Sequence, residues 1–220
     1  VLFRSGVVMK AHYNGLIPRN PFIQFHISPN VKEREYLTED ELKAVMTHEF
    51  ADSKLAYIRD IFIFASFTAL SFVDIQELTN DNIVEVNGEK WILSKRHKTK
   101  VAFQVKLLDI PLQIVERYRP MQKDNRIFPG LNYWSICKPL KRMIRECGIT
   151  KSISFHCSRH GFATLALSKG MPIESVSRVL GHTNIVTTQL YAKITTQKLD
   201  NDLTMFGDKL SKTFNGITMS

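Results

Sequence analysis

Apolar residues recur at helical spacing along most of the chain, and its most apolar run is IFIFASFTALSFV, residues 61–73. This run is shorter than the roughly 20 residues that a bilayer span requires. It also contains two serines and a threonine. We therefore expect a helix buried in the core over residues 53–68, followed by a short helix over 73–78.

Capping and stop signals organise the region before this helix. In LTEDELKAVMTHEF, Thr38 precedes Glu41 by three positions, which is the capping-box pattern of a helix start. Leu42, Val45 and Met46 form the apolar stripe of this helix. Upstream, GLIPRNPF ends an earlier helix at about Gly15, and the polar stretch ISPNVKEREY predicts a linker between two domains.

The period then changes from helical to alternating. NIVEVNGEKWILSKRHKTKVAFQVKLL alternates around Asn87 and Gly88, a strong hairpin turn, and a second turn is expected near residues 97–100. Helical patterns resume after Pro111, over 112–118, 133–147, 156–168 and 172–180. The predicted fold is mainly α with a small three-stranded antiparallel sheet, of the α+β class.

Charge adds a candidate binding surface. The chain has 30 Lys and Arg against 21 Asp and Glu, a net charge of +9 and a pI of about 9.5. Residues 90–159 hold 16 basic and 4 acidic residues, so the excess lies in the middle of the chain. A basic region in an otherwise slightly acidic chain predicts a surface that binds a polyanion. A solvated cationic face is the alternative.

The cysteines and histidines do not follow the spacing of a metal site. Cys137, Cys147 and Cys157 are ten residues apart, which gives no CxxC pair and an odd number of thiols. His156 and His160 are four apart, but the residue after His156 is not the glutamate of a metalloprotease helix. We expect free thiols in a reducing compartment, no metal and no cofactor.

The stretch FHCSRHGFATLALSKGMPIESVSRVLGHTNIVTTQLYAKI, residues 155–194, holds the candidate chemistry. Tyr191 lies nine positions after His182, beyond a glycine that can close the preceding helix. A phenol has a pKa of about 10, so it needs a proton acceptor and a cationic pocket to attack. His182 and His156 are candidate acceptors. Arg159 lies on the helix face of His156 and can hold phosphate oxygens.

These residue types together suit attack on a phosphodiester that leaves a covalent phosphotyrosine. Arginines can stabilise the pentavalent phosphorus without a metal. Lys98, in the turn of SKRHKTK, is placed to protonate the leaving 5′-oxygen. Each residue alone also has an ordinary reading, since such a tyrosine usually packs and such an arginine is usually solvated. Their joint order favours the chemical interpretation.

The segment HCSRHGFATLALSKGMPIESVSRVLGHTNIVTTQLYA resembles the signature of the tyrosine recombinase (phage integrase) family, and the match spans residues 36–213. The resemblance places His156, Arg159, His182 and Tyr191 on family catalytic positions, with Tyr191 as nucleophile. Lys98 falls on the catalytic lysine. It implies the tyrosine recombinase catalytic-domain fold, and a site-specific recombinase that integrates or excises a mobile element through a 3′-phosphotyrosine.

One position departs from the family pattern. The family carries an arginine after T-G-L, whereas FTALSFVDIQELT has Ala69 for the glycine and Ser71 for the arginine. Integrases of conjugative and mobilisable transposons resemble this chain in having serine there. A serine cannot replace a bidentate guanidinium. We therefore expect Arg96 to supply the missing charge, the alternative being that it only touches the DNA backbone. Asp74 is either a helix cap or a partner for a catalytic cation.

The resemblance also implies a domain organisation. Residues 1–30 would be the remnant of a core-binding domain with its linker, 31–195 the catalytic domain, and 196–220 a C-terminal tail. Because the chain begins with Val, we expect it to be a piece of a longer protein. The tail has an apolar stripe at helical spacing formed by Leu199, Leu203, Phe206 and Leu210. It is expected to dock on a neighbouring protomer; folding back on its own domain is the alternative.

The expected partner is double-stranded DNA, on which the chain would assemble into a tetramer through the tail. DNA-bending accessory proteins are expected as further partners. No association with a membrane is expected. The expected location is the bacterial cytoplasm, with the nucleoid. The residues expected to contact DNA are Lys95, Arg96, Lys98, Lys100, Lys141 and Arg142.

Two other functions compete with this interpretation. The segment PIESVSRVLGHTNIVTTQLYAKI has the outline of a helix-turn-helix, so the chain could be a DNA-binding module without catalysis. A type IB topoisomerase would share the phosphotyrosine chemistry but relax DNA instead of exchanging strands.

Overall fold

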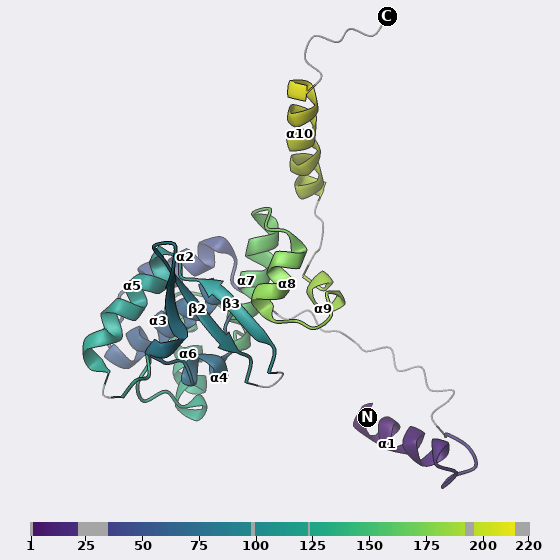
Figure 1. Cartoon of the computed structure of the whole chain (residues 1–220). Helices are drawn as coiled ribbons and strands as arrows, with labels where there is room; N and C mark the ends of the chain where they lie inside the picture. The colour runs from purple at the N-terminus through teal and green to yellow at the C-terminus, as the bar shows by residue number, and fades with distance from the viewer. Residues whose placement is uncertain (1, 22–34, 98–99, 123, 192–195, 214–220) are drawn as a thin grey trace, which may run out of the picture. The chain divides into compact units, whose positions relative to one another are not determined.

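The computed structural model describes residues 2–21, 35–97, 100–122, 124–191 and 196–213 (Figure 1). The chain divides into two compact units, Val1–Glu33 and Arg34–Ser220. Helix α1 (Leu2–Tyr13) belongs to the first unit, and all later elements belong to the second. The domain boundaries expected from the sequence remain predictions.

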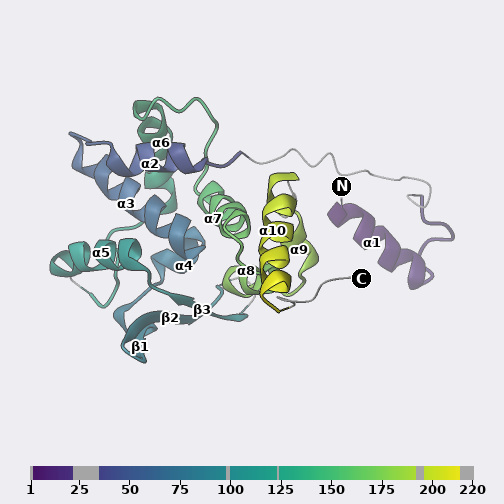
Figure 2. The same cartoon turned by 90° about the horizontal axis from the view of Figure 1, so that it is seen from above.

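Helix α3 (Ser53–Thr68) lies at the centre of the core of the second unit. Its apolar residues face every side, and Ile61, Phe62 and Phe64 are at most 1% exposed. A helix that is apolar all round must be covered on all sides. The helices that contact it, shown in Figure 2, are α2 (Glu39–Thr47), α5 (Asp109–Tyr118), α6 (Tyr133–Glu146) and α7 (His156–Ser168). Within the described residues, no helix is both long and apolar enough to cross a bilayer.

The local signals read from the sequence explain where several elements begin. At α2, the backbone N–H of Thr38 donates to Glu41 Oε2 at 2.7 Å and the N–H of Glu41 donates to Thr38 Oγ1 at 3.3 Å, so the capping box is confirmed. Helix α5 begins at Asp109, three residues earlier than predicted, because Pro111 is tolerated in a first turn.

The sheet is the predicted antiparallel meander of β1 (Ile83–Val86), β2 (Glu89–Lys95) and β3 (Ala102–Lys106). Asn87 and Gly88 both have positive φ, as the tight turn between β1 and β2 requires. At the other end of β2, Arg96 N–H donates to Val101 O and Lys100 N–H donates to Arg96 O, both at 2.8 Å. These two bonds close the turn between β2 and β3.

Three short helices complete this part of the chain. Helix α4 (Phe72–Gln76) begins one residue earlier than predicted, with Ser71 as its N-cap. Helix α8 (Ile173–Leu180) lies beside β3 (Figure 1) and ends at Gly181, whose φ is +63°. Helix α9 (Val186–Gln189) was not predicted, since a four-residue turn leaves no periodic pattern.

A second, smaller apolar cluster joins α7 to α8. Its buried members are Ala69, Ala163, Leu167, Val176 and Leu180, and Tyr191 is among the residues packed against them. This cluster fixes the end of α8 and the segment after α9 against α7.

The carboxylate of Asp60 is buried in the middle of α3 and ties this helix to α5. It accepts hydrogen bonds from Arg59 Nε at 2.8 Å, Arg117 Nη1 at 2.7 Å and Tyr118 Oη at 2.7 Å. Its side chain is only 4% exposed. A buried charge is tolerated when donors of this kind surround it.

Replacing Asp60 by Ala should lower the free energy of unfolding by about 3 kcal/mol, because the largely buried Arg59 and the buried hydroxyl of Tyr118 would lose their acceptor. Urea denaturation measures the change. Arg142→Ala is the control, since it removes an ion pair with Glu146 that is mostly exposed and should cost less than about 1 kcal/mol. Equal costs for the two variants would contradict a structural role for the Asp60 network.

Candidate active site

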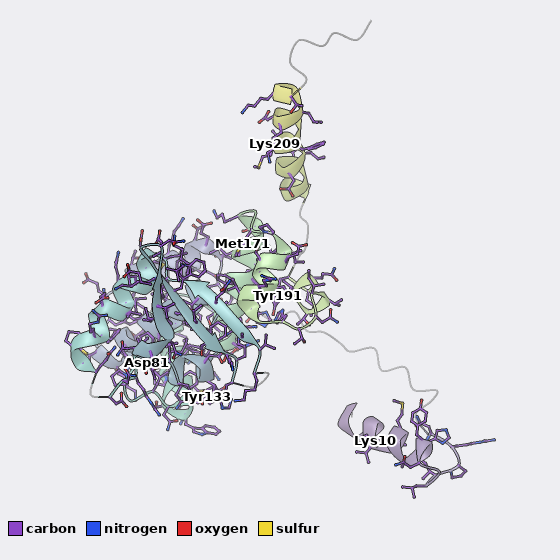
Figure 3. All side chains as sticks on the ribbon, in the orientation of Figure 1. Lys10, Asp81, Tyr133, Met171, Tyr191 and Lys209 are labelled. Carbon is purple, nitrogen blue, oxygen red and sulfur yellow. The ribbon has the colours of Figure 1, made fainter. Side chains whose placement is uncertain are left out.

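Helix α7 supplies one face of the candidate site. His156 is its first residue, and Arg159 and His160 follow at the three- and four-residue spacing that puts them on the same side. His182 follows the end of α8, and Tyr191 follows α9. Tyr191, labelled in Figure 3, lies in the part of the molecule formed by α7, α8 and α9.

Arg159 is buried and connects two backbone segments. Its Nη1 donates to the carbonyl of Ala69 at 2.8 Å, and its Nη2 donates to the carbonyl of Leu180 at the end of α8. Ala69 caps α3 with a left-handed φ of +56°. Alanine adopts this region less readily than glycine. The bend nevertheless leaves the Ala69 carbonyl as an acceptor for Arg159.

Arg96 lies in the same gap, although it comes from the β2–β3 turn. Its Nη1 pairs with Asp74 Oδ2 at 2.7 Å, and its Nη2 donates to the carbonyl of Val179, next to the carbonyl that Arg159 uses. The guanidinium stacks over Phe103, 4.0 Å from the ring centroid. Its side chain is only 7% exposed.

Two further features mark how tightly Arg96 is held. A Cβ on Gly181 would lie 2.9 Å from Arg96 Nε and 3.0 Å from its Cγ, so glycine is required there for space as well as for its positive φ. The buried Nε of Arg96 has no hydrogen-bond partner among the residues that the structure describes.

Ser71 and Asp74 together hold Arg96 from the start of α4. Ser71 Oγ donates to Asp74 Oδ2 at 2.7 Å, while the backbone N–H of Asp74 donates to Ser71 Oγ at 3.3 Å. His97 N–H donates to Asp74 Oδ1 at 3.0 Å. Burial by itself would raise the pKa of Asp74, but these bonds and Arg96 hold that pKa below its ordinary value. Asp74 is thus both a helix cap and the partner of a cation.

The field of the two arginines acts on their neighbours. Burial, and then the nearby charge of Arg96, lowers the pKa of Arg159 to about 10, while Tyr191 and Asp74 act in the opposite direction. The phenol of Tyr191 is therefore within electrostatic reach of Arg159.

His182 is neutral at pH 7 in this pocket. Burial lowers the pKa of its imidazole to about 4, with further contributions from Arg159, Arg96 and His156. Its Nδ1 lies 2.8 Å from Thr188 Oγ1, a hydroxyl that is fully buried. The neutral ring can donate or accept a hydrogen bond at its other nitrogen.

His160 is a residue of this site that the sequence reasoning did not assign. Its ring centroid is 4.8 Å from that of His156 and 5.0 Å from that of Tyr191. Its spacing of four from His156 enters the sequence analysis only as a possible metal-binding pattern. The sequence signal that could have identified it is this spacing of four, which places His160 on the same face of α7 as His156.

Among the described basic residues expected to contact DNA, all but Arg96 are at the surface. Lys95 and Lys100 are exposed at the two ends of the β2–β3 turn, and Lys141 and Arg142 are exposed on α6. A hollow of about 450 Å³ on α6 is lined by Lys138, Lys141, Arg142, Arg145 and Glu146. Lys98, the expected proton donor, lies outside the described residues.

The lowered pKa of His182 predicts a pH-dependent contribution to stability. The neutral ring stabilises the fold fully above its unfolded-state pKa near 6.5, and this contribution is lost as the pH falls toward 4. The difference in unfolding free energy between the parent and His182→Gln should therefore shrink by about 2 kcal/mol over that window, after allowance for solvent screening. Denaturation at several pH values measures it. A difference that does not change with pH would contradict the neutral, buried imidazole.

Most of the chain is similar to known proteins. The model of the phage integrase family matches residues 35–198. The chain is 32% identical over 177 residues to the tyrosine recombinase XerA of Pyrococcus horikoshii, covering 74% of this chain and 58% of that relative. It is 26% identical over 204 residues to XerD of Listeria innocua, covering 85% of this chain and 67% of XerD.

Solved structures share the fold. The Tn1549 transposon integrase in complex with a circular intermediate DNA superposes with a TM-score of 0.76 at 17% identity, covering 91% of this chain and 76% of that one. The XerH recombinase in its post-cleavage complex gives a TM-score of 0.66 at 22% identity, over 83% and 56% of the two chains. The chain thus spans little more than half of XerA and XerH. With the family model matching three quarters of its residues, the chain belongs to the phage integrase family.

Proposed function

We propose that this chain is the catalytic domain of a site-specific DNA recombinase that integrates or excises a mobile element. The observation that carries the proposal is that Tyr191, Arg159 and His182 come together at the end of α8. Tyr191 packs against the cluster that includes Leu180, Arg159 donates to the carbonyl of Leu180, and His182 follows it by two residues. Family membership supports the same activity. A binding module would have no use for a tyrosine within electrostatic reach of the buried guanidinium of Arg159.

In the proposed reaction the phenolic oxygen of Tyr191 attacks the scissile phosphorus. The bond from phosphorus to the 5′-oxygen breaks, and the DNA 3′ end stays attached to the tyrosine. Lys98 gives a proton to the leaving 5′-oxygen, and His156 assists removal of the proton of the phenol. Because the phosphotyrosine keeps the energy of the broken bond, a 5′-hydroxyl can reverse the step without ATP.

The two histidines have different parts in this scheme. His182 is neutral, so it contributes a hydrogen bond to a phosphate oxygen instead of a full positive charge. His156 is exposed at the first turn of α7, where it can exchange protons with solvent. We assign stabilisation of the phosphate to His182 and proton movement to His156.

Arg96 is proposed to replace the arginine that the family has at the position of Ser71. Its guanidinium lies beside that of Arg159, because the two donate to adjacent carbonyls of α8, Val179 and Leu180. Ser71 bonds to Asp74, the carboxylate that binds Arg96. A second positive charge thus reaches the start of α4 from the hairpin.

DNA is the proposed partner, bound through exposed basic residues of the β2–β3 turn and of α6. Such contacts to phosphate weaken steeply as salt rises. Helix α10 (Thr196–Thr213) exposes Leu203, Phe206 and Leu210 by 40% or more. We propose that this stripe docks on a neighbouring protomer, so that four copies assemble on DNA, with bending proteins as accessory partners. The proposed location is the bacterial cytoplasm, at the nucleoid.

The two competing functions remain distinguishable by experiment. A helix-turn-helix module would bind DNA without forming a covalent adduct. A type IB topoisomerase would relax supercoiled DNA without exchanging strands between two sites. The relatives and solved structures found here are recombinases and integrases, so neither alternative is favoured.

The nucleophile is tested with a nicked DNA substrate carrying the ends of the element. The parent chain should give a covalent adduct on a denaturing gel, and peptide mapping should place it on Tyr191. Tyr191→Phe should give none, because it lacks the attacking oxygen. A mixture of Tyr191→Phe with Arg159→Ala should also give none, since Tyr191 lies against its own α7. An adduct in Tyr191→Phe would overturn the assignment.

The role of Arg96 is tested by removing its charge and then placing an arginine at position 71, where the family has one. Arg96→Ala should slow adduct formation by about 100-fold at saturating DNA, the usual cost of one stabilising donor. Adding Ser71→Arg to Arg96→Ala should recover part of the rate, because the new guanidinium starts beside the same Asp74. Lys95→Ala, which removes the neighbouring exposed charge, is the control. If Arg96→Ala cleaved as fast as the parent while Arg159→Ala was inactive, the replacement would be excluded.

A further inference from the structure

His160 has no role in the reaction described above, yet it contacts the nucleophile. Its ring is 5.0 Å from the ring of Tyr191 between centroids, with an angle of 59° between the planes. It also meets the ring of His156 edge to face, at 4.8 Å and 87°. The ring of His160 therefore contacts two residues of the proposed reaction.

The backbone around Tyr191 gives the phenol little support of its own. Helix α9 has only four residues, and the N–H of Tyr191 donates to Thr188 O at 3.0 Å. Thr188 is in turn bonded to His182. These bonds fix the position of the backbone at residue 191. The direction of the tyrosine side chain depends instead on what its ring packs against.

Side-chain contacts decide that direction. The second apolar cluster, which includes Ala163 and Leu167 of α7, packs against Tyr191. His160 lies three residues before Ala163 on the same helix, so α7 presents an aromatic ring next to an apolar surface. Aromatic pairs prefer offset or tilted arrangements at this separation. The ring of His160 is therefore suited to hold the phenol at one orientation.

We propose that His160 is a positioning residue, whose ring holds the phenol of Tyr191 in line with the phosphate bound at Arg159. This inference rests on the proposed function. It assigns no proton transfer to His160. The role requires a flat ring at position 160 and does not depend on the protonation or hydrogen bonds of the ring nitrogens.

Adduct formation on the nicked substrate, at saturating DNA and in a single turnover, tests the proposal. His160→Ala should slow the step about tenfold, the size expected for losing one aromatic contact, with DNA affinity unchanged. His160→Phe should stay within about threefold of the parent, because the contact between rings is kept. His48→Ala is the matched control. It removes a ring contact with Phe50 at 4.5 Å, outside the site, and should leave the rate unchanged.

A second measurement separates positioning of the tyrosine from an effect on the phosphate or on folding. In a Tyr191→Phe background, hydrogen peroxide can serve as a small nucleophile that needs no positioning by the protein. Cleavage driven by peroxide should be the same with and without His160→Ala, and the thermal unfolding of both proteins should confirm that they are folded.

The outcomes are distinct. If His160→Phe were as slow as His160→Ala, or if His160→Ala slowed the peroxide reaction equally, the positioning role would be overturned. If the parent formed no adduct at all, the proposed function would fail and this inference with it. A normal parent with an unimpaired His160→Ala would reject the inference alone.

Discussion

Two arginine side chains share one buried gap in this molecule, and much of the local structure serves to make that possible. Like charges repel, and burial removes the water that would solvate them. Arg159 and Arg96 are accommodated because the gap supplies one carboxylate and three backbone carbonyls as acceptors. Two of these carbonyls are at the end of α8, where the last turn of a helix leaves its acceptors free.

This requirement explains residues that otherwise look unfavourable. Ala69 adopts a left-handed conformation, and its carbonyl then receives Arg159. Gly181 leaves room for the stem of Arg96. Ser71 caps α4 and also bonds to the carboxylate of Asp74, so it helps to place the acceptor that binds Arg96. Local backbone strain is thus compensated by the electrostatics of the pocket.

The sequence predicted the parts of this structure that depend on local rules. The capping box at Thr38, the turn at Asn87 and Gly88, and the central apolar helix follow from capping, turn geometry and periodicity, and all are present. Residue spacing also identified the histidines, Arg159 and Tyr191 as one candidate set. The burial of Arg96 and its pairing with Asp74 could not be derived, because they join residues 22 positions apart through tertiary packing. The contact between His160 and Tyr191 likewise depends on where the chain returns after α9.

The β2–β3 turn has a mechanical consequence for the pocket. Arg96 and His97 begin this turn, and both bond to Asp74, one through its side chain and the other through its backbone. The carboxylate of Asp74 therefore links the hairpin to the start of α4. Moving this turn away from α4 would break the bonds that Arg96 and His97 make to Asp74. Displacement of the turn would therefore also disturb the position of the Arg96 charge in the pocket.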